Sequence, residues 1–193
     1  MNAEHLRLCA SAEWATTVET QILPWALHGY VLGNDVLEVG PGPGVTTSLL
    51  ARMVLKLTAV EVDAALAEAL AGRMAGLNVE VIQADGAALP FDSARFSGAA
   101  CFTMLHHVPS LALQDRLLAE VRRVLRPGGV FVGVDSLPSP EWWALHDGDT
   151  CVPVDPSRLK ERLIRAGFGD TEVELSTPAP SRRFRFAAVS PRV

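Results

Sequence analysis

Continuous apolar runs alternate with helical stretches through the middle of this sequence, and this alternation limits the possible folds more than any other feature. The first run, at 35–40, ends in a turn rich in glycine and proline, and helical spacing follows over 45–53. Unbroken apolar runs are typical of parallel strands that are covered by helices on both faces. We therefore expect an α/β fold with a doubly wound, mostly parallel sheet.

The same rhythm recurs along the chain. Residues 4–29 read as helical with an interruption at Pro24, and a Pro-rich segment follows Asp135. Further strands are predicted at 56–62, 78–84, 96–103, 129–135, 171–176 and 182–190. Further helices are predicted at 64–74, 113–125 and 157–167. Strand, tight turn and helix form the repeating unit, which is the organisation of doubly wound sheets.

The charge balance disfavours polyanionic partners. The net charge is −5, from 17 Lys and Arg against 22 Asp and Glu, so a broad phosphate-binding face is not expected. The start of the chain carries Glu4, Arg7 and Glu13 and has no continuous apolar stretch of the signal-peptide type. No run of about eighteen apolar residues occurs anywhere. We expect a cytoplasmic protein with neither a nucleic-acid nor a membrane partner.

Cysteine usage suggests neither a disulfide framework nor a zinc site. The three cysteines, Cys9, Cys101 and Cys151, are odd in number and widely spaced, and no C-x-x-C pair occurs. We therefore expect three reduced, mostly buried thiols, and we expect no bound metal.

Three glycines are concentrated in the turn after the first strand, in the stretch EVGPGPG. Glycine lets a ligand approach the backbone closely, and amides of the turn and the helix start can donate to an anionic group. The dinucleotide-binding fingerprint G-x-G-x-x-G would have its third glycine at position 45, which is Val45. The G-x-G-x-G spacing of Gly40, Gly42 and Gly44 therefore indicates a ligand-binding turn of a different spacing.

Carboxylates end the second and third strands. Glu61 lies 21 residues after Gly40, which matches the offset of roughly 20 residues at which an acidic side chain reaches a ribose in this architecture. Asp85 ends the third strand, where a carboxylate can accept a hydrogen bond from an exocyclic amine such as that of adenine. Three consecutive strands thus end in residues that suit an adenosine-containing ligand.

Taken together, the motifs EVGPGPG, AVEVD, QADGAALPF, FSGAACFTMLHHV and LRPGGVF resemble those of the class I S-adenosylmethionine-dependent methyltransferases, most closely the methyltransferase type 11 group of small-molecule enzymes. The resemblance covers about residues 35–136. It implies the family's Rossmann-like seven-stranded sheet with helices on both faces, with 171–176 and 182–190 as the last two strands. Ser97 departs from the group, which usually has Asp after the preceding Phe.

The resemblance also implies a cofactor site, with S-adenosylmethionine as cofactor and S-adenosylhomocysteine as product. The glycine turn would lie against the amino-acid end of the cofactor, and Glu38 would orient the turn or the amino group. Glu61 would hold the ribose hydroxyls, and Asp85 with Gly86 would meet the adenine. The implied cofactor-binding residues are Glu38, Gly40, Pro41, Gly42, Gly44, Glu61, Val62, Asp85, Gly86 and Phe102.

Three other functions compete with this interpretation. The front half also resembles the rRNA adenine dimethyltransferases, but the stretch CFTMLHHV lacks the Pro and Tyr with which those enzymes bind a flipped adenine. A nicotinamide oxidoreductase of the short-chain type would need Tyr-x-x-x-Lys, whereas Asn34 follows Tyr30, the sole tyrosine. A cofactor-binding module without catalysis stays open.

Methyl transfer needs a base only if the acceptor carries a proton, since the sulfonium already activates the methyl group. His106 and His107 follow the fourth strand, and His146 with Asp147 offers a second candidate pair. Adjacent residues leaving a strand point to opposite sides. We therefore expect His106 on the substrate side, as the candidate catalytic base, and His107 turned into the protein.

Acceptor recognition is expected outside the family-like segment. The whole chain, 1–193, is predicted to form a single domain with a helical cap over 1–30 and a Rossmann-like core over 31–193. The cap would cover the methyl group as a lid, and a second aromatic wall would come from Trp142 and Trp143. These features favour a planar or apolar small-molecule acceptor. The predicted lid residues are Trp14, Ile22, Trp25 and Tyr30.

Overall fold

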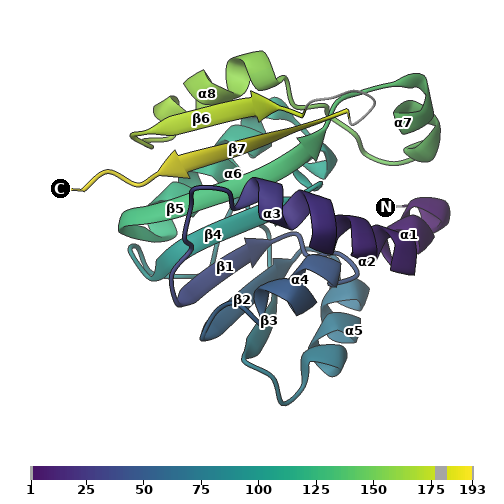
Figure 1. The fold of residues 1–193 in the computed structure, drawn as a ribbon, viewed down its shortest axis with the longest axis horizontal. Coiled ribbons are helices and arrows are strands. Elements are labelled where there is room, and N and C mark those ends of the chain that lie inside the picture. Colours follow the sequence, from purple (N-terminus) through teal and green to yellow (C-terminus); the bar gives the residue numbers. More distant parts are fainter. Residues whose placement is uncertain (1, 177–181, 193) are drawn as a thin grey trace.

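In the computed structural model, which describes residues 2–176 and 182–192, seven strands form one sheet in the order β3-β2-β1-β4-β5-β7-β6 (Figure 1). Neighbouring strands pair in parallel except at β7, which is antiparallel to both β5 and β6. The predicted seven-stranded, mostly parallel sheet is confirmed. The strands are β1 (Asp35–Val39), β2 (Lys56–Glu61), β3 (Val79–Gln83), β4 (Phe96–Phe102), β5 (Leu125–Ser136), β6 (Thr171–Leu175) and β7 (Arg183–Val189).

Helices cover both faces of this sheet. On one face lie α3, α4 and α5, and on the other lie α6 and α8 (Figure 1). No described helix is both long and apolar enough to cross a bilayer. The helical elements are α1 (Ala3–Cys9), α2 (Ala12–Thr17), the π-helical η1 (Val18–Ile22), α3 (Leu23–Ala26), α4 (Val45–Leu50), α5 (Ala64–Met74), the 3-10 turn η2 (Leu105–His107), α6 (Leu111–Val124), α7 (Pro140–Leu145) and α8 (Pro156–Arg165).

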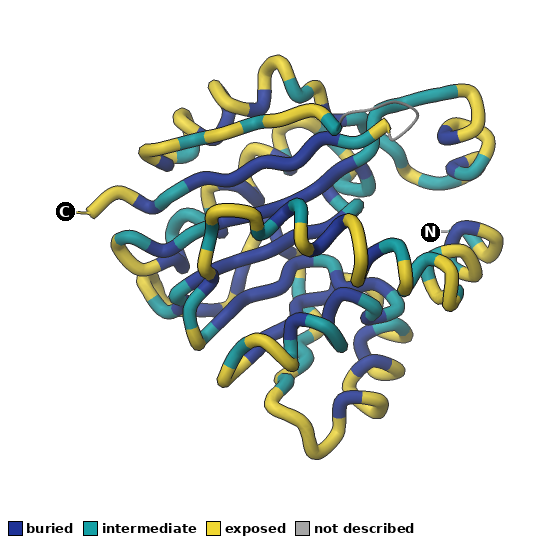
Figure 2. The backbone as a smooth tube through the Cα atoms, in the orientation of Figure 1, coloured by how far each residue is buried: buried dark blue, intermediate teal, exposed yellow. Residues whose placement is uncertain are grey.

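Two apolar layers hold the helices on the sheet, which is buried along its central strands (Figure 2). On the α6 side, Leu117 and Val121 lie one turn apart and pack with Phe131 of β5. On the other side, Ile22 and Leu50 pack with strand residues of β1, β2 and β5. Each fully buried Leu, Ile or Phe contributes about 1.5–3 kcal/mol, so the layers position the strand ends firmly.

The N-terminal helical region is broken at a different place from the one predicted. Ser11 accepts a hydrogen bond from the Trp14 N–H and starts a new helix, α2, after α1 has ended. From there helical backbone continues through η1 into α3 without a break at Pro24. Pro24 directly follows the π-helical turn η1, and a local π turn of this kind interrupts the regular hydrogen-bond ladder where the proline offers no N–H. The interruption therefore lies at Ala10 and Ser11.

The segment after β5 contains a helix that the Pro-rich composition concealed. Ser139 accepts a hydrogen bond from the Trp142 N–H, and Pro140 occupies the first position of α7. A capping serine followed by proline is a common start signal for a helix. Figure 1 shows α7 beside α1 at the edge of the sheet where the parallel strands end. The two short helices therefore cover the same edge.

Candidate functional site

A cavity of about 420 Å³ opens at the carboxyl ends of the first four strands. Its walls come from the turns after β1, β2, β3 and β4, and α1, α2 and η1 close it from the side. Between β1 and β4 the strand order reverses, and ligands of doubly wound sheets bind at such switch points. The residues that this position brings together include Gly40, Pro41, Gly42, Glu61, Val62, Asp85, Gly86, Phe102, Thr103 and His107.

The turn after β1 uses its three glycines for two purposes. All three have left-handed backbone, with φ of +68° at Gly40, +53° at Gly42 and +81° at Gly44. Gly40 and Gly42 line the cavity, as predicted, but Gly44 is not among the lining residues. A Cβ at Gly44 would lie 2.3 Å from Cδ1 of Leu70 in α5. The predicted ligand contact of Gly44 is therefore corrected to a packing contact that lets α5 approach the turn.

The Glu61 carboxylate holds the glycine turn to the end of β2. The Gly42 N–H donates to Oε2 over 3.0 Å, and the Asp63 N–H donates to Oε1, also over 3.0 Å. Glu61 is 6% exposed and borders the cavity. Because each carboxylate oxygen accepts more than one hydrogen bond, ligand hydroxyls can still bind there. This tie to the turn was not predicted from the sequence.

Glu38 lies behind the cavity wall rather than in it. The side chain is 1% exposed, and its Oε1 accepts a hydrogen bond from Thr46, which lines the cavity. Its second oxygen, Oε2, has no hydrogen-bond partner among the described residues. Burial raises the pKa of Glu38 to about 7. Because Glu38 does not line the cavity, it acts on the ligand site from behind Thr46 rather than by direct contact.

The ends of β3 and β4 supply the remaining predicted residues. Pro41, Val62, Gly86 and Phe102 line the cavity, and so does Asp85, whose Oδ1 accepts from the Ala87 N–H over 2.8 Å.

Thr103, which follows β4, was not predicted. Its φ of +50° is unusual for a β-branched residue, and its N–H donates to the Val134 carbonyl over 2.7 Å. Such backbone strain concentrates at functional sites.

The two histidines after β4 have the opposite arrangement to the predicted one. His106 is 2% exposed, and its Nδ1 lies 2.5 Å from Oδ1 of Asp135. His107, by contrast, lines the cavity. The prediction that His106 faces the substrate is therefore wrong. The strand ends at Phe102, and the pair lies on η2, whose side chains turn by about 120° per residue instead of alternating.

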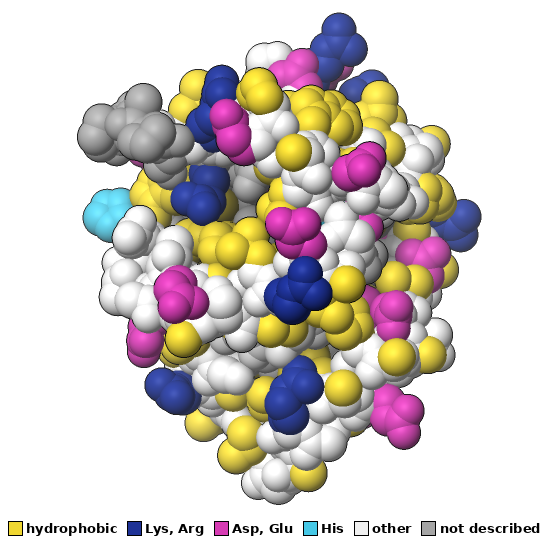
Figure 3. All heavy atoms as spheres, turned by 90° about the vertical axis from the view of Figure 1, so that its right-hand side faces the viewer, with side chains coloured by type: hydrophobic (Ala, Val, Ile, Leu, Met, Phe, Trp, Pro, Cys, Tyr) yellow, Lys and Arg dark blue, Asp and Glu magenta, His cyan; other side chains and the backbone are white. Residues whose placement is uncertain are grey.

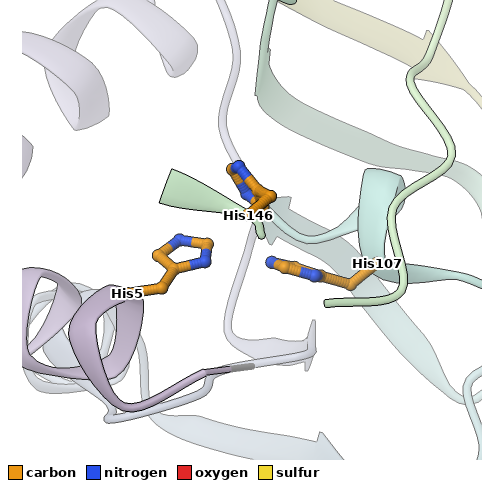
Figure 4. A group of neighbouring side chains, drawn as sticks. All are labelled: His5, His107 and His146. Carbon is orange, nitrogen blue, oxygen red and sulfur yellow. The ribbon is translucent and has the colours of Figure 1, made fainter. Parts of the chain in front are cut away.

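Four of the chain's five histidines meet beside the cavity. His5 of α1, His107 of η2 and His146 at the end of α7 point their rings toward one another (Figure 4). Burial lowers the pKa of His5 to about 4 and that of His107 to about 3, and it also lowers the pKa of His146. The three rings are therefore neutral at pH 7. The sequence analysis paired His107 with His106 and His146 with Asp147, did not consider His5, and so missed the cluster.

The aromatic residues predicted around the acceptor are only partly in place. Trp14 and Ile22 line the cavity as expected for a helical lid. Trp25 instead packs against the sheet, and the Tyr30 hydroxyl donates to Glu172. The predicted aromatic wall is wrong: Trp142 is buried against His106 and His146, and Trp143 is half exposed outside the cavity. The reason is α7, whose buried face turns Trp142 away from the cavity.

Comparison with known proteins identifies the family. A family model described as a methyltransferase domain matches residues 36–129. The uncharacterized methyltransferase YodH of Bacillus subtilis (strain 168) is 30% identical over 148 residues, which is 72% of this chain and 61% of that protein. A fatty-acid O-methyltransferase of Mycolicibacterium smegmatis is 35% identical over 130 residues, 61% of this chain and 43% of that protein. A ribosomal RNA small subunit methyltransferase A of Deinococcus radiodurans is 47% identical over 66 residues, 34% of this chain and 22% of that protein.

Solved structures share the fold. A SAM-dependent methyltransferase from Aquifex aeolicus superimposes with a TM-score of 0.77 at 18% identity, over 98% of this chain and 99% of that one. The matched methyltransferase domain and the shared fold support a class I S-adenosylmethionine-dependent methyltransferase, as the sequence motifs predicted. S-adenosylmethionine is the cofactor of this family. The chain spans about half the length of the curated relatives it matches.

Replacing Gly44 with alanine should destabilise the fold by about 2–5 kcal/mol, because left-handed backbone costs about 1–2 kcal/mol and overpacking about 1–3 kcal/mol. Gly72, in the interior of α5, is the matched control, because an added Cβ there meets nothing within 4 Å. Gly72→Ala should be neutral or stabilise by up to about 1 kcal/mol. Urea unfolding followed by circular dichroism measures both variants. Equal stabilities would show that Leu70 does not restrict the turn.

Removing the Glu61 carboxylate should weaken the binding of S-adenosylhomocysteine by about a hundredfold or more, since two charge-assisted hydrogen bonds of about 1.5–3 kcal/mol each are lost. Isothermal titration calorimetry of Glu61→Ala measures this loss. Glu61→Gln keeps the shape of the side chain and one acceptor oxygen. Its affinity for S-adenosylhomocysteine should therefore lie between those of Glu61→Ala and the wild type. NADP serves as the comparison ligand and should give no comparable heat. Unchanged affinity in a folded Glu61→Ala protein would contradict the assigned role.

Proposed function

We propose that this chain transfers the methyl group of S-adenosylmethionine to a small, largely apolar acceptor held in the cavity. The observation that carries this proposal is the composition of the cavity wall. On the side of the helical cap the wall is mostly apolar, with Trp14, Val18 and Ile22 beside Cys9 and the neutral His5, and no Lys or Arg is among the described residues that line the cavity. An apolar wall without cations suits an apolar molecule better than a polyanion.

The residues present fit the cofactor. Glu38 would hold Thr46 in the wall near the ammonium group of an amino acid, and the Glu61 carboxylate suits vicinal hydroxyls. Asp85 and Gly86 would border the adenine, and Pro41, Val62 and Phe102 would complete the cofactor contacts. Bound S-adenosylmethionine supplies a methyl group already activated on a sulfonium.

The contribution of the chain is then to hold the acceptor in line and to exclude water. The cap helices provide the covering wall, and correct positioning of two reactants removes a large entropic barrier. His106 does not serve as the base in this proposal. Its ring does not line the cavity, because Nδ1 is paired with Asp135 and Nε2 lies 3.1 Å from Nε2 of His146.

The main alternative is an acceptor in ribosomal RNA. The partial relatedness to a ribosomal RNA methyltransferase favours it, whereas the larger match to a fatty-acid O-methyltransferase favours a small apolar acceptor. On the face that bears the strand ends, Lys and Arg side chains are scattered among acidic and apolar ones (Figure 3). Such a surface lacks the clustered cations that phosphate contacts need. The cavity and this surface therefore both favour the small molecule.

The acceptor class can be tested by release of S-adenosylhomocysteine from panels of small apolar acids, phenols, amines and thiols, with an rRNA fragment as the competing substrate. Trp14→Ala should raise the KM of an accepted small molecule about ten- to a hundredfold, because an aromatic wall worth about 1.5–3 kcal/mol is lost. The cofactor affinity should not change. Trp143→Ala removes an exposed tryptophan outside the cavity and should leave KM unchanged. Turnover of the rRNA fragment alone would refute the proposal.

Association with RNA should be weak and unselective, because no cation lines the described cavity and the net charge is −5. Filter binding of an rRNA fragment at several salt concentrations measures this. A dissociation constant in or above the non-specific range, about 10⁻⁴–10⁻⁶ M, is expected. A tight complex whose affinity falls steeply with salt would instead support the ribosomal RNA acceptor.

A further inference from the structure

Three histidine side chains from distant parts of the chain converge at the end of the cavity that the cap covers (Figure 4). His5, His107 and His146 each offer one ligand nitrogen, and these nitrogens lie within 4.8 Å of one another. His5 and His107 also line the cavity. The cluster is therefore built into the wall beside the acceptor.

Each of the three rings has its Nδ1 facing an oxygen atom. Nδ1 of His146 lies 2.6 Å from the Trp142 carbonyl oxygen, and Nδ1 of His107 lies 3.3 Å from that of Thr150. Because a carbonyl oxygen only accepts, both Nδ1 atoms carry the proton and donate. Nδ1 of His5 lies 3.5 Å from Oδ2 of Asp149 in the same way. The lone pairs of the neutral rings are consequently on the three Nε2 atoms.

This arrangement is the one found around bound metal ions, whose histidine ligands donate the second ring N–H to a carboxylate or a backbone carbonyl. In addition, Nε2 of His107 is buried and has no hydrogen-bond partner among the described residues. An unsatisfied buried nitrogen that faces two further imidazoles is costly unless a ligand occupies the space between them.

We propose that His5, His107 and His146 bind a divalent transition-metal ion, with Zn²⁺ as the type case, and leave one coordination position open toward the cavity. Imidazole nitrogen is a preferred ligand of such ions, and three protein ligands with an open fourth position are typical of catalytic zinc sites. In tetrahedral coordination with Zn–N of about 2.0–2.1 Å, the nitrogens would lie roughly 3.4 Å apart. The rings therefore need only small rotations to close on the ion.

A second group of side chains overlaps the first. His106, His146 and Cys151 also lie within 4.8 Å of one another, so both groups would use His146. His106, His146 and Cys151 are not the proposed set, because none of these three residues lines the cavity and an ion there would have no position open to it. When the ion binds Nε2 of His146, the contact between that atom and Nε2 of His106 is broken. The His106 ring then packs against the His146 ring on the side away from the ion.

An ion in this place would hold a hydroxyl, carboxylate or thiol of the acceptor at its open position. A metal ion lowers the pKa of a bound hydroxyl or thiol, so the same ion would favour the nucleophilic form without a protein base. This consequence rests on the proposed methyl transfer. The metal site itself does not, since it can be measured without cofactor or acceptor.

The test is metal binding by the whole chain after removal of bound ions with a chelator. Zn²⁺ is titrated against a competing chromophoric chelator, and Co²⁺ serves as the spectroscopic probe for a tetrahedral nitrogen site. The wild type should take up one equivalent with micromolar or tighter affinity. His5→Gln, His107→Gln and His146→Gln should each weaken binding a hundredfold or more. Asp149→Asn should weaken it about ten- to a hundredfold, as outer-shell partners do.

His28→Gln is the matched control, because His28 is the fifth histidine and is exposed outside the cluster. It should bind like the wild type, and so should Cys151→Ser. Circular dichroism and thermal unfolding confirm that each variant is folded, and His5→Gln on the first helix keeps the test valid if His146→Gln unfolds. The site would be overturned if the wild type took up no stoichiometric metal ion. It would also be overturned if Cys151→Ser lost metal binding while His5→Gln kept it. If the chain bound the metal ion but did not bind S-adenosylhomocysteine, the proposed function would be refuted and the metal site would stand.

Discussion

The hydrogen bond from the Gly42 N–H to Glu61 joins the turn after β1 to the end of β2 and defines the shape of the cavity floor. The turn can offer that N–H only because left-handed backbone at Gly40, Gly42 and Gly44 alternates with prolines, whose φ stays near about −65°. Gly44 then starts α4 and leaves room for Leu70 of α5. One carboxylate and three glycines thus place two helices and a ligand surface at the switch point of the sheet.

The same constraint explains why the floor of the cavity was predictable. Buried parallel strands read as apolar runs, and the residues at each strand end are local in sequence, so Glu61 and Asp85 could be placed at one edge of the sheet without tertiary contacts. The turn also carries a strong local signal, because its glycines and prolines have few conformational alternatives. What local patterns could not reveal is how these parts interact, such as the packing of Gly44 on α5 and the tie between Glu61 and Gly42.

The acceptor half depends on contacts between distant segments, and there the predictions failed. The rule that adjacent residues alternate sides holds in a strand, but the chain leaves β4 in a 3-10 turn, so His106 and His107 exchanged their predicted places. The capping Ser139 and the following Pro140 indicated α7, yet the prolines around them were read as an irregular segment. Because α7 was missed, the position of His146 beside His5 could not be deduced, and His146 was not connected with the pair His106 and His107.

The part of the site that was predictable also coincides with the segment that the family model matches. Residues 36–129 carry the glycine turn, Glu61, Asp85 and His107, whereas His5 and His146 lie outside that segment. The Asn2 side chain donates to the Leu145 carbonyl, which joins α1 to the end of α7 and brings these two histidines to the matched domain. The matched segment therefore builds the floor of the cavity, and the flanking helix α1 adds part of its wall. Segments that flank a conserved architecture in this way can vary while the strand ends keep their arrangement.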